Sequence, residues 1–312
     1  MPRTSTASSS PPDPAPPPGV PHRPREIESR LSELGIVPSR RLGQSFLTDP
    51  FVADAEAALL EVPAGAAVTE IGGGLGILTE ALLRRGIGPL TVIERDRRLA
   101  AHLREVFGAR ITLKVGDALE LPLPPAEAVV GNLPFSVATP LLTRLFEARV
   151  PRIVVLLQKE VGERYTAGPR THGYGRPAIQ AALYGRAERF APVPASAFSP
   201  VPAVAGVLVR FTGREGPLPV RSPLRLERTV RDLFGRRRKQ LGNLLPAVAG
   251  GSERARRLAE QAGWPSEWAR MRPEELGPEA YFALADALET GPTVDPPRSD
   301  GPGTDRPGAP PP

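Results

Sequence analysis

The chain has 312 residues, a formal net charge of +6 and no cysteine, which excludes disulfide bonds, thiolate metal sites and a cysteine nucleophile. No apolar run approaches the roughly 18 to 20 residues that span a bilayer, and the first residues lack the apolar segment of a secretory signal, so we expect a soluble cytoplasmic protein without membrane contact. Almost all of the positive charge is arginine, whose planar group suits phosphate and weakly favours a nucleic-acid partner.

Composition divides the chain into five parts. Residues 1–24 and 291–312 are rich in proline, serine and glycine, and we predict that they are disordered tails. Residues 25–211 alternate short apolar runs with amphipathic ones, which predicts an α/β domain. A linker rich in glycine and proline follows at 212–222, and residues 223–290 carry apolar side chains at helical spacing, which predicts a small all-helical domain.

Strands and helices alternate within the predicted α/β domain. Strands are expected at 67–71, 90–94, 111–115, 128–130, 152–157 and 204–211, and helices at 75–85, 97–107, 139–148 and 176–184. This alternation is typical of a parallel, doubly wound sheet, and it predicts a Rossmann-like fold.

A glycine-rich turn joins the first expected strand to its helix. In "TEIGGGLG", Gly72, Gly74 and Gly76 lack the side chains that would keep a ligand away from the backbone. Glu94 ends the next strand about 20 residues later, where a carboxylate accepts hydrogen bonds from ribose hydroxyls. Asp117 follows the third strand, where it suits either an adenine amino group or an ordinary turn.

The spacing of these glycines distinguishes between cofactors. The dinucleotide pattern G-x-G-x-x-G needs glycine at position 77, and Ile77 therefore argues against NAD and against a dehydrogenase. The pattern G-x-G-x-G, with Glu70 two residues before its first glycine, is that of methyltransferases that use S-adenosylmethionine. The sequence thus predicts S-adenosylmethionine as the cofactor.

The stretch "GNLPF" follows the fourth expected strand. A strand-ending turn with a core phenylalanine is its plainest interpretation. Beside an adenosyl cofactor, a chemical role fits better, because an exocyclic adenine nitrogen is a poor nucleophile. The side-chain oxygen of Asn132 and a backbone carbonyl near Leu133 or Pro134 would hold its two hydrogens, while Phe135 would stack on a flipped base.

These motifs, together with four further segments, resemble the ribosomal RNA adenine N6-dimethyltransferase family. The segments are "RRLGQSFLTDP" (40–50), "LLQKEVGERYTAGPRTHGYGR" (156–176), "VPASAFSPVPAVAGVLVRF" (193–211) and "RRRKQLGNLL" (236–245). The resemblance covers about residues 28–290. It implies a class I methyltransferase domain, dependent on S-adenosylmethionine, with a small C-terminal all-helical domain.

The resemblance also implies two groups of site residues. The cofactor-binding group is Gln44, Ser45, Leu47, Gly72, Gly74, Glu94, Asp117 and Asn132, with Phe46 closing over the methionine end beside its neighbours. The catalytic group is Asn132, Leu133, Pro134, Phe135 and Phe198, the last as a second aromatic wall for the base. Ser45, Gly73 and Phe135 depart from the Asn, Pro and Tyr that are usual in the family.

The activity implied is dimethylation of two adjacent adenines near the 3′ end of small-subunit (16S) ribosomal RNA, by a monomer acting on an assembling 30S particle. "GRRRKQ" at 235–240 is expected to contact phosphates rather than to be only a solvated face, and 164–176 is expected to be a mobile loop on the substrate side. Two alternatives stay open: a large-subunit (23S) adenine methyltransferase that confers macrolide resistance, and an RNA-binding assembly factor without catalysis.

Overall fold

The computed structural model describes residues 19–38, 44–134 and 136–290. Most of the two predicted tails, the start of the segment at 40–50 and Phe135 lie outside the described residues. The chain divides into two compact units, Met1–Leu218 and Pro219–Pro312, at a point inside the predicted linker. No helix in these described ranges is both long and apolar enough to cross a membrane.

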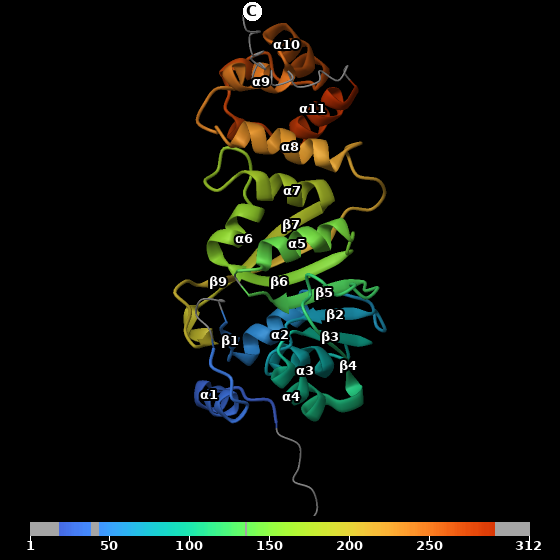
Figure 1. Ribbon diagram of the computed structural model, residues 1–312, viewed down its shortest axis with the longest axis vertical. Helices are drawn as coiled ribbons and strands as arrows, with labels where there is room; N and C mark the ends of the chain where they lie inside the picture. The colour runs from blue at the N-terminus through green and yellow to red at the C-terminus, as the bar shows by residue number, and fades with distance from the viewer. Residues whose placement is uncertain (1–18, 39–43, 135, 291–312) are drawn as a thin grey trace, which may run out of the picture. The chain divides into compact units, whose positions relative to one another are not determined.

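The first unit is built on a seven-stranded sheet (Figure 1). In spatial order the strands are β4 (Thr112–Val115), β3 (Leu90–Glu94), β2 (Val68–Ile71), β5 (Ala128–Asn132), β6 (Arg152–Gln158), β9 (Gly206–Gly213) and β7 (Gly185–Val193). The first five are parallel, and β9 and β7 are antiparallel to their neighbours. The chain reverses its direction across the sheet between β2 and β5, which is where open α/β sheets bind ligands.

Helices cover both faces of this sheet, as the predicted Rossmann-like class requires. One face carries α2 (Pro50–Ala58), α3 (Ile77–Arg84) and α4 (Arg97–Phe107), and the other carries α5 (Ala138–Glu147), α6 (Lys159–Tyr165) and α7 (Arg176–Tyr184). Side chains alternate between the two cores along each strand. In β6, Val154 packs with the first group and Val155 with the second.

Several elements were missed by the sequence analysis. They are α1 (Pro24–Glu33), β1 (Phe46–Leu47), α2, α6, β7 and β8 (Phe198–Ser199). The predicted tail at 1–24 overlaps the described structure at its end, because Pro24 begins α1 and His22 lies 3.1 Å from Glu80. Proline suits the first turn of a helix. The Glu26 carboxylate accepts hydrogen bonds from the backbone N–H groups of His22 and Arg23, which precede the helix.

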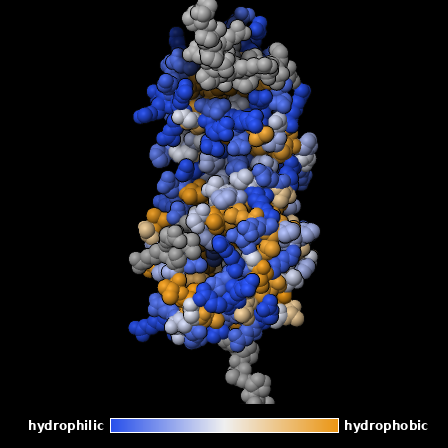
Figure 2. Space-filling view, viewed as in Figure 1, coloured by the Kyte–Doolittle hydropathy of each residue, from blue (hydrophilic) through white to orange (hydrophobic). Residues whose placement is uncertain are grey.

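Within its described residues, 219–290, the second unit has the α-helices α8 (Pro223–Phe234), α9 (Leu241–Ala249), α10 (Ser252–Gln261) and α11 (Pro278–Thr290). Buried Leu233, Leu245 and Tyr281 form part of its core. The Ser222 hydroxyl accepts from the backbone N–H of Arg225 and caps α8. Residues 235–240 join α8 to α9 and are exposed, and the face of this unit drawn in Figure 2 is mainly hydrophilic.

Candidate active site

A cavity of about 480 Å³ lies where the parallel strands end, at the switch point of the sheet. Its wall is formed by the glycine turn after β2, by residues 94–96 at the end of β3, by residues 116–118 after β4, and by residues 132–134, 136 and 137 at the end of β5. Residues 44–47 and Phe198 complete it from distant parts of the chain. The topology thus gathers the predicted site residues that the structure describes into one cavity.

The glycine turn has a conformation that only glycine adopts easily. Gly76 precedes α3 with a φ of 93°, and a Cβ there would lie 2.5 Å from the ring of Phe107. At Gly73, where the family resemblance leads us to expect proline, a Cβ would come within 2.6 Å of Val92. The turn therefore packs directly on β3 and α4, and glycine at position 73 suits that close packing.

Glu94 ties the glycine turn to the end of β3. Its carboxylate accepts from the backbone N–H groups of Gly74 and Asp96, each at 2.9 Å. Burial raises the pKa of Glu94, while these N–H groups act in the opposite direction. The carboxylate is thus held at the cavity wall, as a ribose acceptor must be.

Asp117 is engaged on both of its oxygens. Oδ1 accepts from the backbone N–H of Leu119 at 2.9 Å, and Oδ2 pairs with Arg95 at 3.3 Å. The turn role that the sequence allowed is therefore present in the structure. A ligand that donates to this carboxylate would share it with Arg95, which is largely exposed and also lines the cavity.

Glu70 is a second acid at the cavity, and it is fully buried. Its Oε2 accepts from the Thr79 hydroxyl at 2.7 Å, whereas Oε1 has no hydrogen-bond partner within the described part of the chain. Burial raises the pKa of Glu70 to about 7, Thr79 lowers it, and the charge of Glu94 raises it further. Two buried carboxyl groups on one wall favour a ligand that carries positive charge.

Asn132 ends β5 and lines the same cavity. Its side-chain oxygen Oδ1 is buried and has no hydrogen-bond partner among the described residues. Because a buried acceptor without a donor costs about 1 to 3 kcal/mol, such a group indicates a ligand that donates a hydrogen bond. A substrate amino group is such a donor.

The remaining walls come from a two-stranded antiparallel sheet. β1 pairs with β8, so that Leu47 faces Phe198 in register, and Thr48 donates its N–H to the carbonyl of Ala197 at 2.8 Å. Ser45, where asparagine is usual in the family, donates its hydroxyl to the carbonyl of Pro200 at 3.0 Å. This serine therefore anchors the segment before β1 to the loop after β8.

A further buried acid, Glu56 of α2, lies near Glu70 but does not line the cavity. It is fully buried, and neither carboxyl oxygen has a partner in hydrogen-bond geometry in the described ranges. Burial raises the pKa of Glu56 well above its usual value, the nearby Glu70 raises it further, and the backbone N–H of Gly131 lowers it. The fold therefore favours the protonated form of Glu56.

Replacing Glu56 with leucine should stabilise the protein. Because the pKa is raised by folding, the native state holds this proton more tightly than the unfolded chain, and stability falls as the pH rises above about 4.5. We expect E56L to gain about 1 to 3 kcal/mol at pH 8 and less at pH 5, because it removes a buried polar group. Urea unfolding at both pH values tests this, and an equal or negative effect at pH 8 would contradict it.

The structure places all but one of the predicted site residues on the cavity wall. Phe135 lies outside the described residues, and its role stays a prediction. The wall also contains residues that the sequence analysis did not name as part of the site, among them Arg95, Leu99, Leu141 and Leu156. Such apolar or exposed residues are common in any sequence, so nothing in the sequence marks them as part of a site.

The predicted mobile loop at 164–176 begins with residues of α6 and includes the buried Tyr174.

Comparison with known proteins points to one family. The family model described as ribosomal RNA adenine dimethylase matches residues 38–263. A relative from Methanospirillum hungatei, named a probable ribosomal RNA small subunit methyltransferase A, is 38% identical over 79% of this chain and 98% of its own.

Two solved structures also match. A dimethyladenosine transferase from Plasmodium falciparum has a TM-score of 0.66 at 23% identity, covering 77% of this chain and 95% of its own. The 23S ribosomal RNA methyltransferase ErmE has a TM-score of 0.60 at 25% identity, covering 78% and 100%. Because the family match spans well over half of the chain and contains every residue of the cavity, this protein belongs to the ribosomal RNA adenine dimethylase family and is a methyltransferase.

Proposed function

We propose that this methyltransferase uses S-adenosylmethionine to dimethylate the N6 atoms of two adjacent adenines near the 3′ end of small-subunit ribosomal RNA, in an assembling 30S particle. The observation that supports it most directly is the buried side-chain oxygen of Asn132, which has no partner among the described residues and lies on a cavity whose wall also carries two buried acids. A relative named for the small subunit is 38% identical, whereas the 23S enzyme is 25% identical, which favours the small subunit.

The residues present suit this cofactor. S-adenosylmethionine supplies an electrophilic methyl group on a positively charged sulfur. Glu70 and Glu94 provide the acidic wall that such a cation requires, and Gly72 leaves its side of the cavity open because it has no side chain. Glu94 is the candidate to hold the ribose hydroxyls and Asp117 the candidate to accept from the adenine amino group.

The target base needs acceptors rather than a base catalyst. Asn132 Oδ1 and a backbone carbonyl near Leu133 would each accept one hydrogen of the adenine amino group, which directs its lone pair toward the methyl group. Phe198 is buried at the cavity and supplies an apolar wall for a flipped base. The methylated nitrogen becomes acidic and loses its proton without help from a charged side chain.

Transfer of labelled methyl groups tests the proposed substrate. Unmethylated small subunits and, separately, large-subunit RNA are incubated with the enzyme and labelled S-adenosylmethionine, and the nucleosides are then analysed. Dimethyladenosine in small-subunit RNA alone is the expected result. Label only in large-subunit RNA would indicate a 23S methyltransferase of the macrolide-resistance type. No label in either RNA would indicate an RNA-binding assembly factor without catalysis.

The exposed basic segment at 235–240 should bind the phosphates of RNA. We expect R237A/R238A to weaken binding to small subunits and to reduce the slope of log affinity against log salt by about one for each phosphate that is no longer neutralised. The matched control is R256A/R257A on α10, where each arginine pairs with a glutamate of its own helix. An equal effect of the two double variants would show that only net charge matters.

A further inference from the structure

The N-terminal helix α1 packs directly against the glycine turn. Ile27 and Leu31 of α1, with Ile36 just beyond it, form one buried apolar cluster with Leu75 and Leu99. Leu75 belongs to the glycine turn and Leu99 to α4, and both line the cavity. The outer side of the cavity wall is therefore covered by a helix that the sequence analysis did not predict.

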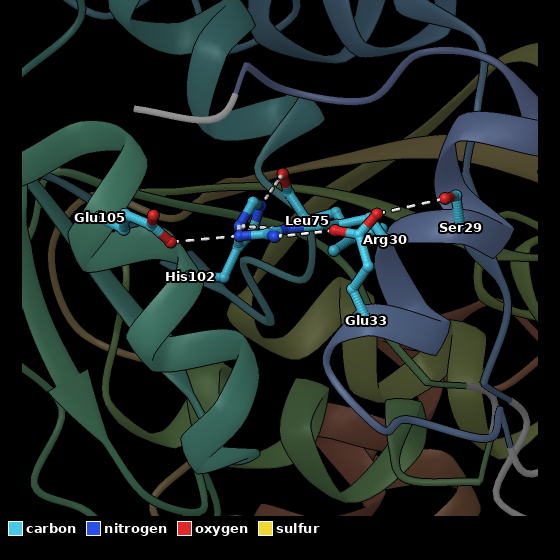
Figure 3. A network of polar contacts seen from close by, with 6 residues as sticks. All are labelled: Ser29, Arg30, Glu33, Leu75, His102 and Glu105. Atoms are coloured by element: carbon cyan, nitrogen blue, oxygen red, sulfur yellow. Dashed lines mark hydrogen bonds and ion pairs between the residues drawn. The ribbon is translucent and has the colours of Figure 1, made fainter. Parts of the chain in front are cut away.

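A polar network crosses the same contact (Figure 3). The guanidinium of Arg30 donates to His102 Nδ1, from Nε at 3.2 Å and from Nη2 at 3.0 Å. The same guanidinium pairs with Glu33 at 3.0 Å and with Glu105 at 3.1 Å. On its other side, His102 Nε2 lies 3.3 Å from the carbonyl oxygen of Leu75. One histidine thus connects α1 to the backbone of the glycine turn.

The chemistry of these groups permits only one form of the histidine. Arginine can only donate, so Nδ1 of His102 must be unprotonated, and a carbonyl can only accept, so Nε2 must carry the hydrogen. His102 is 1% exposed, and burial lowers its pKa, as does Arg30, while the Leu75 carbonyl and Glu105 act in the opposite direction. A neutral ring with its hydrogen on Nε2 satisfies both neighbours.

The helix also reaches the opposite wall of the cavity. Ser199 in β8, the residue after Phe198, donates its hydroxyl to Glu28 of α1 at 3.3 Å. α1 therefore contacts the glycine turn through Arg30 and His102, and the wall predicted to hold the base through Glu28. A single helix braces two sides of one cavity.

We propose that Arg30 and His102 are positioning residues that hold the carbonyl of Leu75, and with it the glycine turn, in the conformation that binds S-adenosylmethionine. The inference rests on the proposed use of that cofactor. Neither side chain lines the cavity, so both act through the backbone between Gly74 and Gly76. Loss of either one frees the turn without removing any group that faces the cofactor.

The test compares four variants. R30L and H102L remove the two positioning residues, H102Q keeps an amide that can accept from Arg30 and donate to Leu75, and R25L removes an exposed arginine from the same helix. Two quantities are measured at pH 8: the Kd for S-adenosylmethionine by calorimetry without RNA, and hydrogen exchange at residues 72–78 in the ligand-free protein.

We expect R30L and H102L to raise the Kd about tenfold and to speed exchange in the turn, because each loses hydrogen bonds of the network that holds the Leu75 carbonyl. H102Q should stay within about threefold of the parent, and R25L should match it. The KM for RNA should not change. A merely structural role would lower stability but leave the turn's exchange and the Kd of the folded protein unaltered.

Unchanged Kd and exchange in R30L and H102L would overturn the proposal. If H102L does not fold, R30L alone tests the proposal, because Arg30 is more exposed than His102 and its replacement disturbs the core less. Failure of the proposed function is separately visible, since the parent protein would then bind no S-adenosylmethionine. Hydrogen exchange in the ligand-free variants would still show whether Arg30 and His102 hold the turn.

Discussion

Replacing Asn132 with alanine should lower the rate of methyl transfer to ribosomal RNA by about a hundredfold or more, the size of effect seen when a single preorganised hydrogen-bonding group is removed from an active site. The cause is the buried Oδ1, which has no hydrogen-bond partner in the described part of the chain and is therefore free to accept a hydrogen of the adenine amino group. Initial rates of labelled methyl incorporation measure the effect.

The matched control is Asn243→Ala, which removes the same side chain from an exposed position on α9. Its rate should equal that of the parent. The thermal unfolding of N132A should also match the parent or rise slightly, because the substitution removes an unsatisfied buried acceptor. Transfer by N132A at the parent rate would show that Oδ1 does not hold the substrate.

The affinity for S-adenosylmethionine should fall as the pH drops below 7. Glu70 has a pKa of about 7 in the ligand-free protein, and a cation in the cavity favours its ionised form, so binding releases a proton in this range. The affinity then decreases by up to about tenfold for each pH unit below 7. Calorimetry between pH 5.5 and 7.5, in buffers of different ionisation enthalpy, measures the proton release.

Two variants test whether Glu70 causes this pH dependence of the affinity. E70Q carries no titrating group and should bind with an affinity that varies little over the range. His102 also titrates in acid, so the series is repeated in H102Q, where the slope due to Glu70 should persist. Glu56 and Glu94 are the other acids near Glu70, and both have a raised pKa. A slope that survives in E70Q would assign the proton to one of them.

Much of the central fold was predictable because its signals are local. The strand at Leu90–Glu94 and the helix at Arg97–Phe107 have the bounds that their apolar spacing predicts, since side-chain period and capping are properties of neighbouring residues. Asp96, for example, caps α4 by accepting from the N–H of Arg98. Short elements gave no such signal, and β1 and β8 have only two residues each because their pairing defines them.

The buried acids Glu70 and Glu56 show the same limit. Glu70 was identified by its position before the glycines, but its raised pKa arises from burial and from Glu94, which belongs to the next strand of the sheet. Glu56 carried no signal at all, because an acid in a helix is ordinarily exposed. Only the packing of α2 on the sheet places it in the interior.

By itself, the sequence determined the chemical identity of this protein: a glycine turn, the acids that follow successive strands, and the "GNLPF" segment predict a methyltransferase acting on adenine. Only the tertiary structure decided how these groups are held. Arg30 and His102 are far apart in the chain, as are Leu47 and Phe198, and each pair meets because strand order and helix packing bring the segments together. Hydrogen bonds and burial depend on distance in space, and the spacing of residues along the chain does not carry that information.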